Sequence, residues 1–335
     1  MTEAGNDHSE LAEITREEKR ERRIREIRYL AILLFIVFAL ALFAWGAYDY
    51  TYICRIRIPG GATVVDRAIV RSHAGIFNVF FKYDMFKKLQ PYLSYRHYII
   101  PDGATEIRGF AFSNTRMRSI RIPDSVTKIG VSAFSVCLEL REVELPDSLT
   151  EIDSFTFAAC TKLSRIRLPD GLRVIGTNAF EMCSSLREIE LPDSMTAIGH
   201  SAFTHCGLTA IRIPNGVSKL DDYAFNQCTG LREAEIPGSV ERIGAGAFQG
   251  CTSLEKVTIS NGVKVIGSEA FRDCTSLKKV EIPYSVTEVR GMAFFSCSSL
   301  SEVLNRSPGA TIEPTTFVGT PYYDWLHPAW ETSPR

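Results

Sequence analysis

Residues 169–191 read PDGLRVIGTNAFEMCSSLREIEL, and nearly the same pattern returns every 23 residues along most of this 335-residue chain. Its most regular mark is a Phe followed three residues later by a Cys. These cysteines are 23 residues apart except for a single step of 22: Cys137, Cys160, Cys183, Cys206, Cys228, Cys251, Cys274 and Cys297. A fixed period of this length predicts a solenoid, in which each repeat is one supersecondary unit stacked on its neighbours.

The end of each repeat predicts a short strand. In the quoted repeat, residues 188–191 alternate polar and apolar side chains, which is the period of a half-buried strand. Pro192 ends the strand, because proline cannot donate a hydrogen bond to a ladder. A strand this short cannot bury its apolar face alone. We therefore expect successive repeats to form one parallel ladder over a core of Ile, Leu, Phe and Cys.

The rest of each repeat returns the chain to the next strand. Its A-F-x-x-C segment, for example residues 179–183, is too short for a long helix and predicts a helical turn or irregular backbone. A glycine or aspartate recurs just before this segment, and both residue types tolerate left-handed backbone, so we expect the chain to reverse there. The residues of this column are Gly130, Asp153, Gly176, Gly199, Asp221, Gly244 and Gly267.

The expected fold class is a repeat solenoid with a parallel strand ladder and short helical or irregular return segments. Nine regular repeats span residues 101–305. Degenerate repeats precede them in residues 53–100, and a half repeat with a C-terminal cap follows in residues 306–335. About eleven strands at roughly 4.8 Å spacing predict a body on the order of 50 Å long.

The consensus L-x-x-I-x-L-P-x-S-V-x-x-I-G-x-x-A-F-x-x-C resembles the BspA-type class of leucine-rich repeats. Residues 140–160, LREVELPDSLTEIDSFTFAAC, are one example. The resemblance is strong over residues 101–305 and weak over residues 53–100. It implies a cell-surface protein that adheres or binds protein or glycan ligands through its strand face, with no enzymatic activity. A repeat scaffold does not by itself fix the ligand.

One stretch before the repeats predicts a transmembrane helix. Residues 29–48, YLAILLFIVFALALFAWGAY, contain no charged residue. Twenty residues at about 1.5 Å each match a hydrocarbon core of roughly 30 Å. A cleaved signal peptide and a buried helix are the alternatives. The transmembrane span is favoured, because the stretch is longer than a typical signal core and residues 47–49 make a poor cleavage site.

The charges around this span predict its orientation. Seven basic residues lie within residues 16–28, and only Arg55 and Arg57 lie in the matching window after the span. The positive-inside bias therefore places residues 1–28, a charged tail with a helical juxtamembrane part, in the cytoplasm. We expect a single-pass protein of type II topology, with its repeats extracytoplasmic or at the cell surface.

Composition and motifs exclude several classes of function. The net charge is −1, so there is no basic excess for binding nucleic acid. No phosphate-binding loop, nucleophile elbow or carboxylate pair stands out from the repeats, so we expect no catalytic residues, no cofactor and no small-molecule substrate. His200 and His205 lie near Cys206, which is a pattern of metal ligands. However, Cys206 belongs to the core column and the histidines occupy variable positions, so we expect no metal site.

The repeat cysteines are expected to be reduced core residues. They occupy one column and point the same way, which suits disulfide geometry poorly, and a free Cys packs as a small hydrophobe. Pairing between some of them is the alternative in an oxidising compartment. Cys54 lies outside the column, near the predicted span, and is a candidate exposed thiol or lipidation site.

The outward positions of the strands form the expected binding face. One column alternates in sign over six successive repeats: Arg121, Glu144, Arg167, Glu190, Arg212 and Glu235. Opposite charges on adjacent strands stabilise by roughly 0.2 to 1 kcal/mol per pair and oppose a slip in register. This charge ladder is therefore either a stability device or a self-screened polar surface for a protein or glycan ligand.

The N-terminal end of the face breaks the charge pattern. Its outward positions hold Asn78, Phe80, His97 and Ile99, and we expect Phe80 and Ile99 to be neighbours. An exposed aromatic and aliphatic pair predicts an interaction patch. Alternatively, residues 81–95 fold over the pair, or a lipid surface covers it. Such a patch next to a membrane span also fits a scaffold that engages another envelope or membrane protein of the same cell, as an alternative to adhesion.

Overall fold

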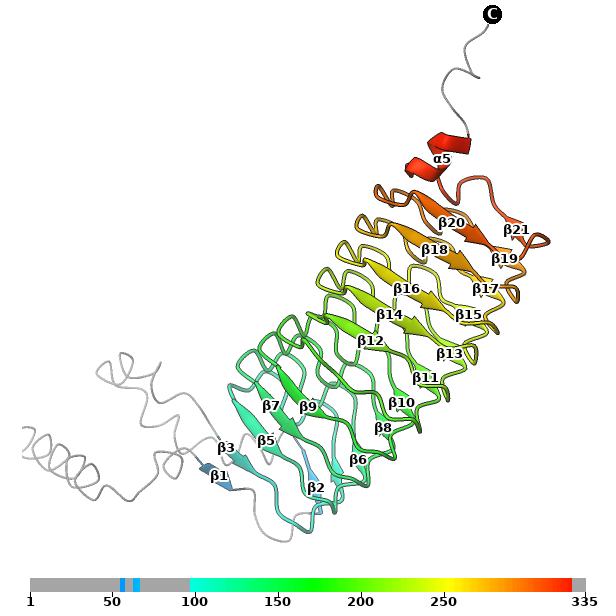
Figure 1. Cartoon of the computed structure of the whole chain (residues 1–335). Coiled ribbons are helices and arrows are strands. Elements are labelled where there is room, and N and C mark those ends of the chain that lie inside the picture. Colours follow the sequence, from blue (N-terminus) through cyan, green and yellow to red (C-terminus); the bar gives the residue numbers. More distant parts are fainter. Residues whose placement is uncertain (1–54, 58–62, 67–96, 327–335) are drawn as a thin grey trace, which may run out of the picture. The chain divides into compact units, whose positions relative to one another are not determined.

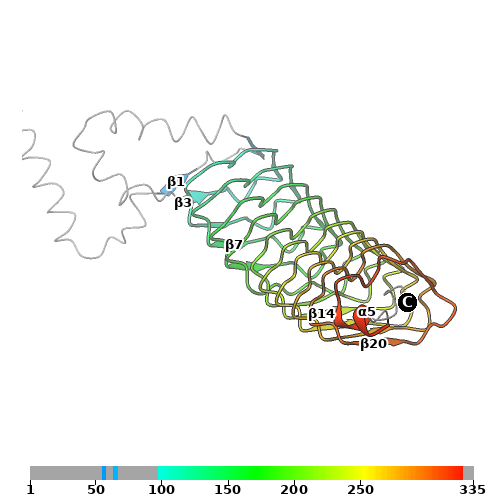
Figure 2. The ribbon, with the colours of Figure 1, turned by 90° about the horizontal axis from the view of Figure 1, so that it is seen from above.

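The computed structural model describes residues 55–57, 63–66 and 97–326, which belong to the second of two compact units, Arg55–Arg335. In this unit the repeats stack in chain order, and each turn of backbone surrounds the same core (Figures 1 and 2). The strand pairs of the described part are all parallel. The solenoid of parallel strands that the period predicts is confirmed.

Each regular repeat except one contributes two short strands, which fall into two columns. The first column, here called the strand face, is the one predicted from L-x-x-I-x-L. It holds β1 (Arg55–Arg57), β3 (His97–Ile99), β5 (Ser119–Arg121), β7 (Glu142–Glu144), β9 (Arg165–Arg167), β12 (Ala210–Arg212), β14 (Glu233–Ile236), β16 (Lys256–Ile259), β18 (Lys279–Ile282) and β20 (Glu302–Asn305).

The second column was not predicted. It holds β2 (Val64–Val65), β4 (Glu106–Ile107), β6 (Lys128–Ile129), β8 (Glu151–Ile152), β10 (Val174–Ile175), β11 (Ala197–Ile198), β13 (Lys219–Leu220), β15 (Arg242–Ile243), β17 (Val265–Ile266), β19 (Glu288–Val289) and β21 (Thr311–Ile312). Strands β8 to β21 of this column form one eight-stranded sheet. Two-residue strands are too short for an alternating pattern to be recognised in sequence, although the second residue of most of them is buried.

A stack of phenylalanine rings runs through the core. Ten rings follow one another at centroid distances of 5.2–5.5 Å with near-parallel planes, from Phe112 to Phe317. Tyr98 meets the first ring and Tyr322 the last, each edge-on at 5.3 Å. Offset or edge-on aromatic pairs contribute about 0.5 to 1.5 kcal/mol beyond area burial, so the recurring Phe links each repeat to the next.

The repeat cysteines line the same core. All eight thiols are free and buried. Each Sγ–H donates to the carbonyl of the Phe in the repeat before it, at S···O distances of 3.0–3.3 Å. The Cys column therefore adds one buried hydrogen bond across each repeat boundary that it spans.

The glycine and aspartate column does not provide the left-handed backbone that we expected there. The positive φ angles lie two residues later and again four residues after that, as at Ser132 (56°) and Val136 (60°). Glycine is favoured for a different reason, because a Cβ on Gly199 would lie 2.9 Å from the carbonyl carbon of Gly176 in the repeat before it. Where Asp153 replaces glycine, its carboxylate accepts the N–H of Ser154 at 2.6 Å.

The first turn of the array differs from the two degenerate repeats expected in residues 53–100. Strand β1 pairs directly with β3, and β2 pairs directly with β4. Strands β1 and β3 are therefore neighbouring strands of the strand face, and residues 67–96 lie outside the described residues. The position beside Ile99 that the sequence assigned to Phe80 is taken by Arg57.

The strand face is interrupted where the sequence predicted a strand at residues 188–191. Within the described residues, no strand forms there and no backbone hydrogen bond joins residues 188–190 to β9 or to β12. The second column stays continuous beside this break, since β8, β10, β11 and β13 pair in order (Figure 1). The prediction that the ladder is unbroken was therefore wrong at this repeat.

Loop length differs at this break. The Phe of a regular repeat lies six residues before the Leu that begins the strand motif, as in Phe180 and Leu186, but five residues separate Phe203 from Leu208. One residue spans at most about 3.5 Å, which is a large part of the roughly 4.8 Å between paired strands. The absence of one residue therefore shortens the reach of the loop considerably. The shortened loop before β12 coincides with the missing pairing to residues 188–190, although β16 and β18 also do not pair with each other and the loop between them, Phe271 to Leu277, has the regular length. The other short loop, Phe112 to Met117, precedes β5, which likewise does not pair with β3.

The C-terminal end carries helix α5 (Pro321–Leu326). Its Tyr322 stands against the last ring of the phenylalanine stack. None of the helices in the described residues is long and apolar enough to cross a membrane. The predicted span at residues 29–48 lies outside those residues.

Candidate functional site

The strand face presents alternating buried and exposed side chains. In β7, Val143 is buried between the exposed Glu142 and Glu144. The register places Arg121 opposite Glu144, and Glu144 opposite Arg167. Two repeats further on, Arg212 lies opposite Glu235. The outward columns read from the sequence are thus brought together within each sheet.

These neighbours form ion pairs at the surface. Arg121 Nε lies 3.6 Å from Glu144 Oε2, and Arg212 Nε lies 3.9 Å from Glu235 Oε2. Arg167 instead approaches two aspartates, Asp147 at 3.8 Å and Asp170 at 3.9 Å. All these side chains are largely exposed, so each pair contributes at most about 1 kcal/mol.

Glu190, the fourth member of the charge ladder, departs from the expected arrangement. It lies in the interruption of the strand face and has no ion-pair partner among the described residues. The single alternating ladder is therefore divided into a part before residues 188–190 and a part after them. The cause is the loss of strand pairing described above.

The interruption also forms a hollow on the strand face. This hollow, called the β9–β12 hollow below, has a volume of about 810 Å³. Its lining consists of Ile166, Arg167, Leu168, Asp170, Glu188, Ile189, Glu190, Leu191, Pro192, Asp193, Ser194, Arg212 and Pro214. A second hollow of about 580 Å³ lies over β5, β7 and β9, and residues such as Glu142 and Arg165 line it. The strand face is thus grooved and polar over its N-terminal half.

The predicted apolar patch lies partly outside the described residues. Asn78 and Phe80 lie outside the described residues. His97 and Ile99 belong to β3, where they pair with Arg55 and Arg57, and Ile99 is partly buried.

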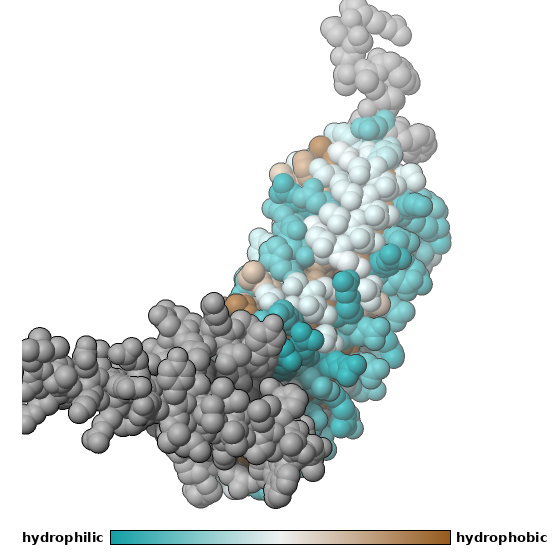
Figure 3. All heavy atoms as spheres, turned by 90° about the vertical axis from the view of Figure 1, so that its left-hand side faces the viewer, coloured by the Kyte–Doolittle hydropathy of each residue, from teal (hydrophilic) through white to brown (hydrophobic). Residues whose placement is uncertain are grey.

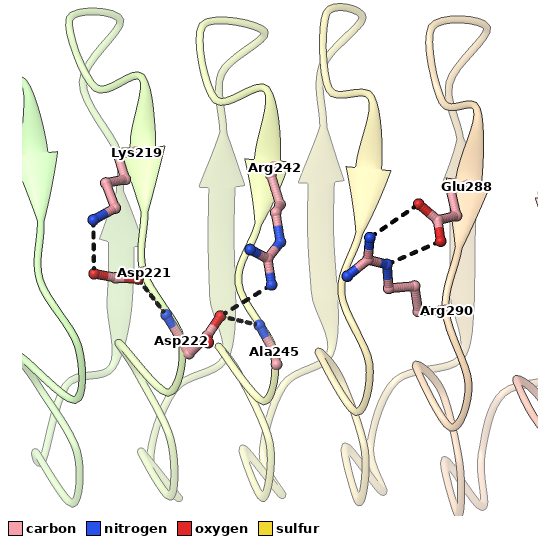
Figure 4. Close-up of polar contacts among 7 residues, drawn as sticks. All are labelled: Lys219, Asp221, Asp222, Arg242, Ala245, Glu288 and Arg290. Carbon is pink, nitrogen blue, oxygen red and sulfur yellow. Dashed lines mark hydrogen bonds and ion pairs between the residues drawn. The ribbon is translucent and has the colours of Figure 1, made fainter.

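The second column carries its own polar contacts between repeats (Figure 4). Asp222 accepts the backbone N–H of Ala245 at 2.7 Å and lies 3.4 Å from a guanidinium nitrogen of Arg242. Lys219 pairs with Asp221 at 3.1 Å within its own repeat. Arg290 and Glu288 form a two-pronged pair at 2.9 and 3.2 Å, which raises the pKa of Arg290. The polar groups drawn in Figure 4 therefore bind one another.

Sequence reasoning missed a set of exposed apolar side chains on the return turns. Phe110, Phe155 and Met182 are 50%, 39% and 47% exposed, and all three have left-handed φ angles. Phe155 lies two residues after Asp153 and Met182 lies six residues after Gly176, which are the two left-handed positions of the repeat. On the side of the array seen in Figure 3, hydrophobic residues of the described part form small groups on a mainly hydrophilic or intermediate surface.

Most of the buried thiols are expected to have low nucleophilic reactivity. Burial raises the pKa of Cys228 to about 12 and raises the pKa values of Cys206 and Cys251 as well. Cys137 differs, because a hydrogen bond with the Cys160 thiol lowers its pKa. A thiol is nucleophilic only as the thiolate, so the raised pKa values suppress reactivity. The described residues contain no group of three His, Cys, Asp or Glu side chains placed to hold a metal ion.

Comparison with known proteins agrees with the repeat pattern. The family model described as the BspA type leucine rich repeat region matches residues 105–232 and 196–323, in six copies. A leucine-rich repeat protein from Bacteroides ovatus is 30% identical, with a TM-score of 0.55 over 66% of this chain and 63% of that one. The chain thus spans less than two thirds of that protein. A leucine rich cell surface protein from Faecalibacterium prausnitzii is 26% identical, with a TM-score of 0.42 over 80% and 86%. Comparison with curated proteins gives no significant match.

Proposed function

The chain belongs to the BspA-type leucine-rich repeat family, and we propose that it is a membrane-anchored protein whose strand face binds protein or glycan ligands outside the cytoplasm, in cell-surface adhesion. The proposed role is binding and not catalysis. The strand face carries this proposal, since it combines exposed, alternating polar side chains with two open hollows.

The contrast between the two columns supports this choice of face. The second column forms one continuous sheet from β8 to β21, and several of its polar groups bind one another. The strand face is divided, and its Glu190 has no ion-pair partner among the described residues. Repeat scaffolds use extended surfaces of this kind for binding.

The anchoring part of the proposal rests on residues 29–48 and on the basic residues before them. It is tested by the accessibility of a C-terminal tag on intact cells, using antibody and external protease, with permeabilised cells as control. We expect the tag to be stained and cleaved without permeabilisation. Protection of the tag on intact cells would contradict the proposed topology.

The binding part is tested with the full-length protein in detergent, screened against extracellular matrix proteins and a glycan array. We expect saturable binding that is weakened by Arg121→Ala with Arg165→Ala on the strand face. The matched control is Lys219→Ala with Arg242→Ala on the second column, which should leave binding unchanged. Equal effects of the two pairs would rule out the strand face as the binding surface.

The exposed return turns favour a second candidate function, a scaffold that engages another membrane or envelope protein of the same cell. Large exposed apolar side chains in left-handed backbone are unfavourable in both exposure and conformation, which favours a functional reason for them. Phe110→Asn with Phe155→Asn should abolish crosslinking to such a partner in cells while leaving the circular dichroism spectrum unchanged. Retained crosslinking would exclude this candidate.

A further inference from the structure

We propose that the β9–β12 hollow binds an extended, basic peptide segment of a partner protein. This inference rests on the proposed strand-face function and narrows it to one site and one class of ligand.

The first observation is the charge of the hollow. Four acidic residues and two arginines line it, a local net charge of −2. The arginines are already matched, because Arg167 lies near Asp147 and Asp170, and Arg212 lies near Glu235. Among the described residues, the carboxylates of Glu188, Glu190 and Asp193 have no cationic partner: they are exposed and appear in none of the ion pairs on this face. Lysine or arginine side chains of a ligand complete this arrangement.

The second observation is the free backbone. Strand residues in a ladder satisfy their N–H and C=O groups through the neighbouring strands. Residues 188–190 form no such bonds with β9 or β12, and the edges of those two strands that face them are open as well. An extended peptide presents matching donors and acceptors along its main chain, as in recognition by strand addition.

The third observation is the apolar floor. Ile166, Ile189 and Leu191 are only partly buried here, whereas their counterparts Ile211 and Ile213 are 3% and 2% exposed. Alternate side chains of an extended peptide point to opposite sides, so apolar residues between the basic ones would cover this floor. The lining contains no aromatic ring on which a sugar would stack, which favours a peptide over a glycan.

The test uses the full-length protein in detergent and fluorescein-labelled six-residue peptides of alternating Lys and Val, followed by fluorescence polarisation. We expect saturable binding of the Lys–Val peptide and none of the matching Glu–Val peptide. An N-methylated Lys–Val peptide, which lacks main-chain donors, should bind at least about tenfold more weakly.

The hollow variant is Glu188→Gln, Glu190→Gln and Asp193→Asn together, for which we expect a loss of affinity of at least about tenfold. The matched control removes the same three charges elsewhere, through Asp102→Asn, Glu241→Gln and Glu255→Gln, and should bind like the wild type. All six positions are exposed, so both variants should keep the wild-type unfolding midpoint.

Two outcomes separate this inference from the function on which it rests. The inference is wrong and the proposed function stands if a ligand from the surface screen binds through the strand face but the Lys–Val peptide does not. The same conclusion follows if the hollow variant binds the peptide as well as the control variant does. If neither the peptide nor any surface ligand binds through the strand face, both are wrong.

Discussion

At the scale of single residues, this chain places side chains in backbone conformations that they rarely adopt. Two positions of almost every repeat in the described residues have left-handed φ angles, and among these pairs only Gly246 and Gly250 are both glycine. Left-handed backbone costs roughly 1 to 2 kcal/mol for an L-residue with a Cβ, and a β-branched residue such as Val136 is the least suited to it. The hydrogen bonds of the stacked turns, such as Val136 N–H to the Ala158 carbonyl at 2.7 Å, hold these residues in place.

Val136→Asn should stabilise the protein by about 1 kcal/mol, because asparagine tolerates the left-handed region better than valine. The measurement is the free energy of unfolding in urea. Val131→Asn is the control, since Val131 is almost equally exposed, at 39% against 41%, but does not have a left-handed φ. An equal gain in both variants would show that surface polarity, and not relief of strain, is responsible.

The buried thiols make stability depend on alkaline pH. The pKa of Cys228 is about 12 in the fold, against 9.0 for an unperturbed thiol. Folding therefore favours the neutral form, and this contribution is complete below pH 9.0 and is lost as the pH rises from 9.0 through 12. We expect the free energy of unfolding to fall by about 1.4 kcal/mol per pH unit for this thiol alone over that window.

The measurement is the free energy of unfolding in urea of the wild type and of Cys228→Ala, from about pH 8 to about pH 10.5. In this range the free energy of unfolding begins to depend on the ionisation of the thiol. Lysine and tyrosine titrate equally in both proteins, so the difference in slope isolates the thiol. Identical slopes would contradict the prediction.

At the scale of elements, alternation of side chains alone does not decide whether a strand pairs. Residues 188–191 have the alternation of a strand, as residues 142–145 have, but only the latter segment forms one, in β7. The difference lies in the following repeat, where a single residue separates Cys206 from Leu208. Local pattern alone is therefore a weak guide to pairing when the partner strand is displaced.

The same comparison indicates how much of the molecule could be predicted. The period, the buried Phe and Cys columns and the register of Arg121 with Glu144 follow directly from the repeat, because side-chain alternation sets register. The second column was missed because its strands have two residues. The β9–β12 hollow was missed because it arises from a missing residue, which a consensus does not record.

Insertion of one serine between Cys206 and Gly207 should restore the 23-residue spacing and let residues 188–190 pair with β12. We expect the amides of Glu188, Glu190 and Arg212 to become protected by at least about tenfold in hydrogen exchange, since ladder hydrogen bonds slow local opening.

The control is the same insertion after Cys228, where the loop already has its regular length and protection at residues 188–190 should not increase. Unchanged exchange in the first variant would show that loop length does not cause the interruption.

At the scale of the whole molecule, stability is passed from each repeat to the next. The described repeats touch mainly their immediate neighbours, through stacked Phe rings, Cys hydrogen bonds and strand pairs. The stability of such an array is approximately a sum of repeat and interface contributions. A substitution in the core of a central repeat weakens its contacts with both neighbouring repeats, whereas a substitution on the surface weakens neither.

Phe203→Ala should destabilise the array by about 3 to 5 kcal/mol, because this fully buried ring stacks on Phe180 at 5.3 Å and on Phe225 at 5.2 Å. The measurement is urea unfolding followed by far-ultraviolet circular dichroism. Phe155→Ala, which removes a ring that is 39% exposed, should change the free energy of unfolding by no more than about 0.5 kcal/mol. Similar losses in both variants would contradict the role given to the stack.

The perpendicular tyrosines at the two ends of the ring stack bear on filament growth. A regular stack of identical units is a template for adding further copies head to tail, and a head-to-tail contact that does not close produces fibres. Here Tyr98 and Tyr322 meet the terminal rings edge-on, and helix α5 lies at the C-terminal end. Within the described residues, the parallel geometry that a further copy could continue is therefore interrupted at both ends of the ring stack.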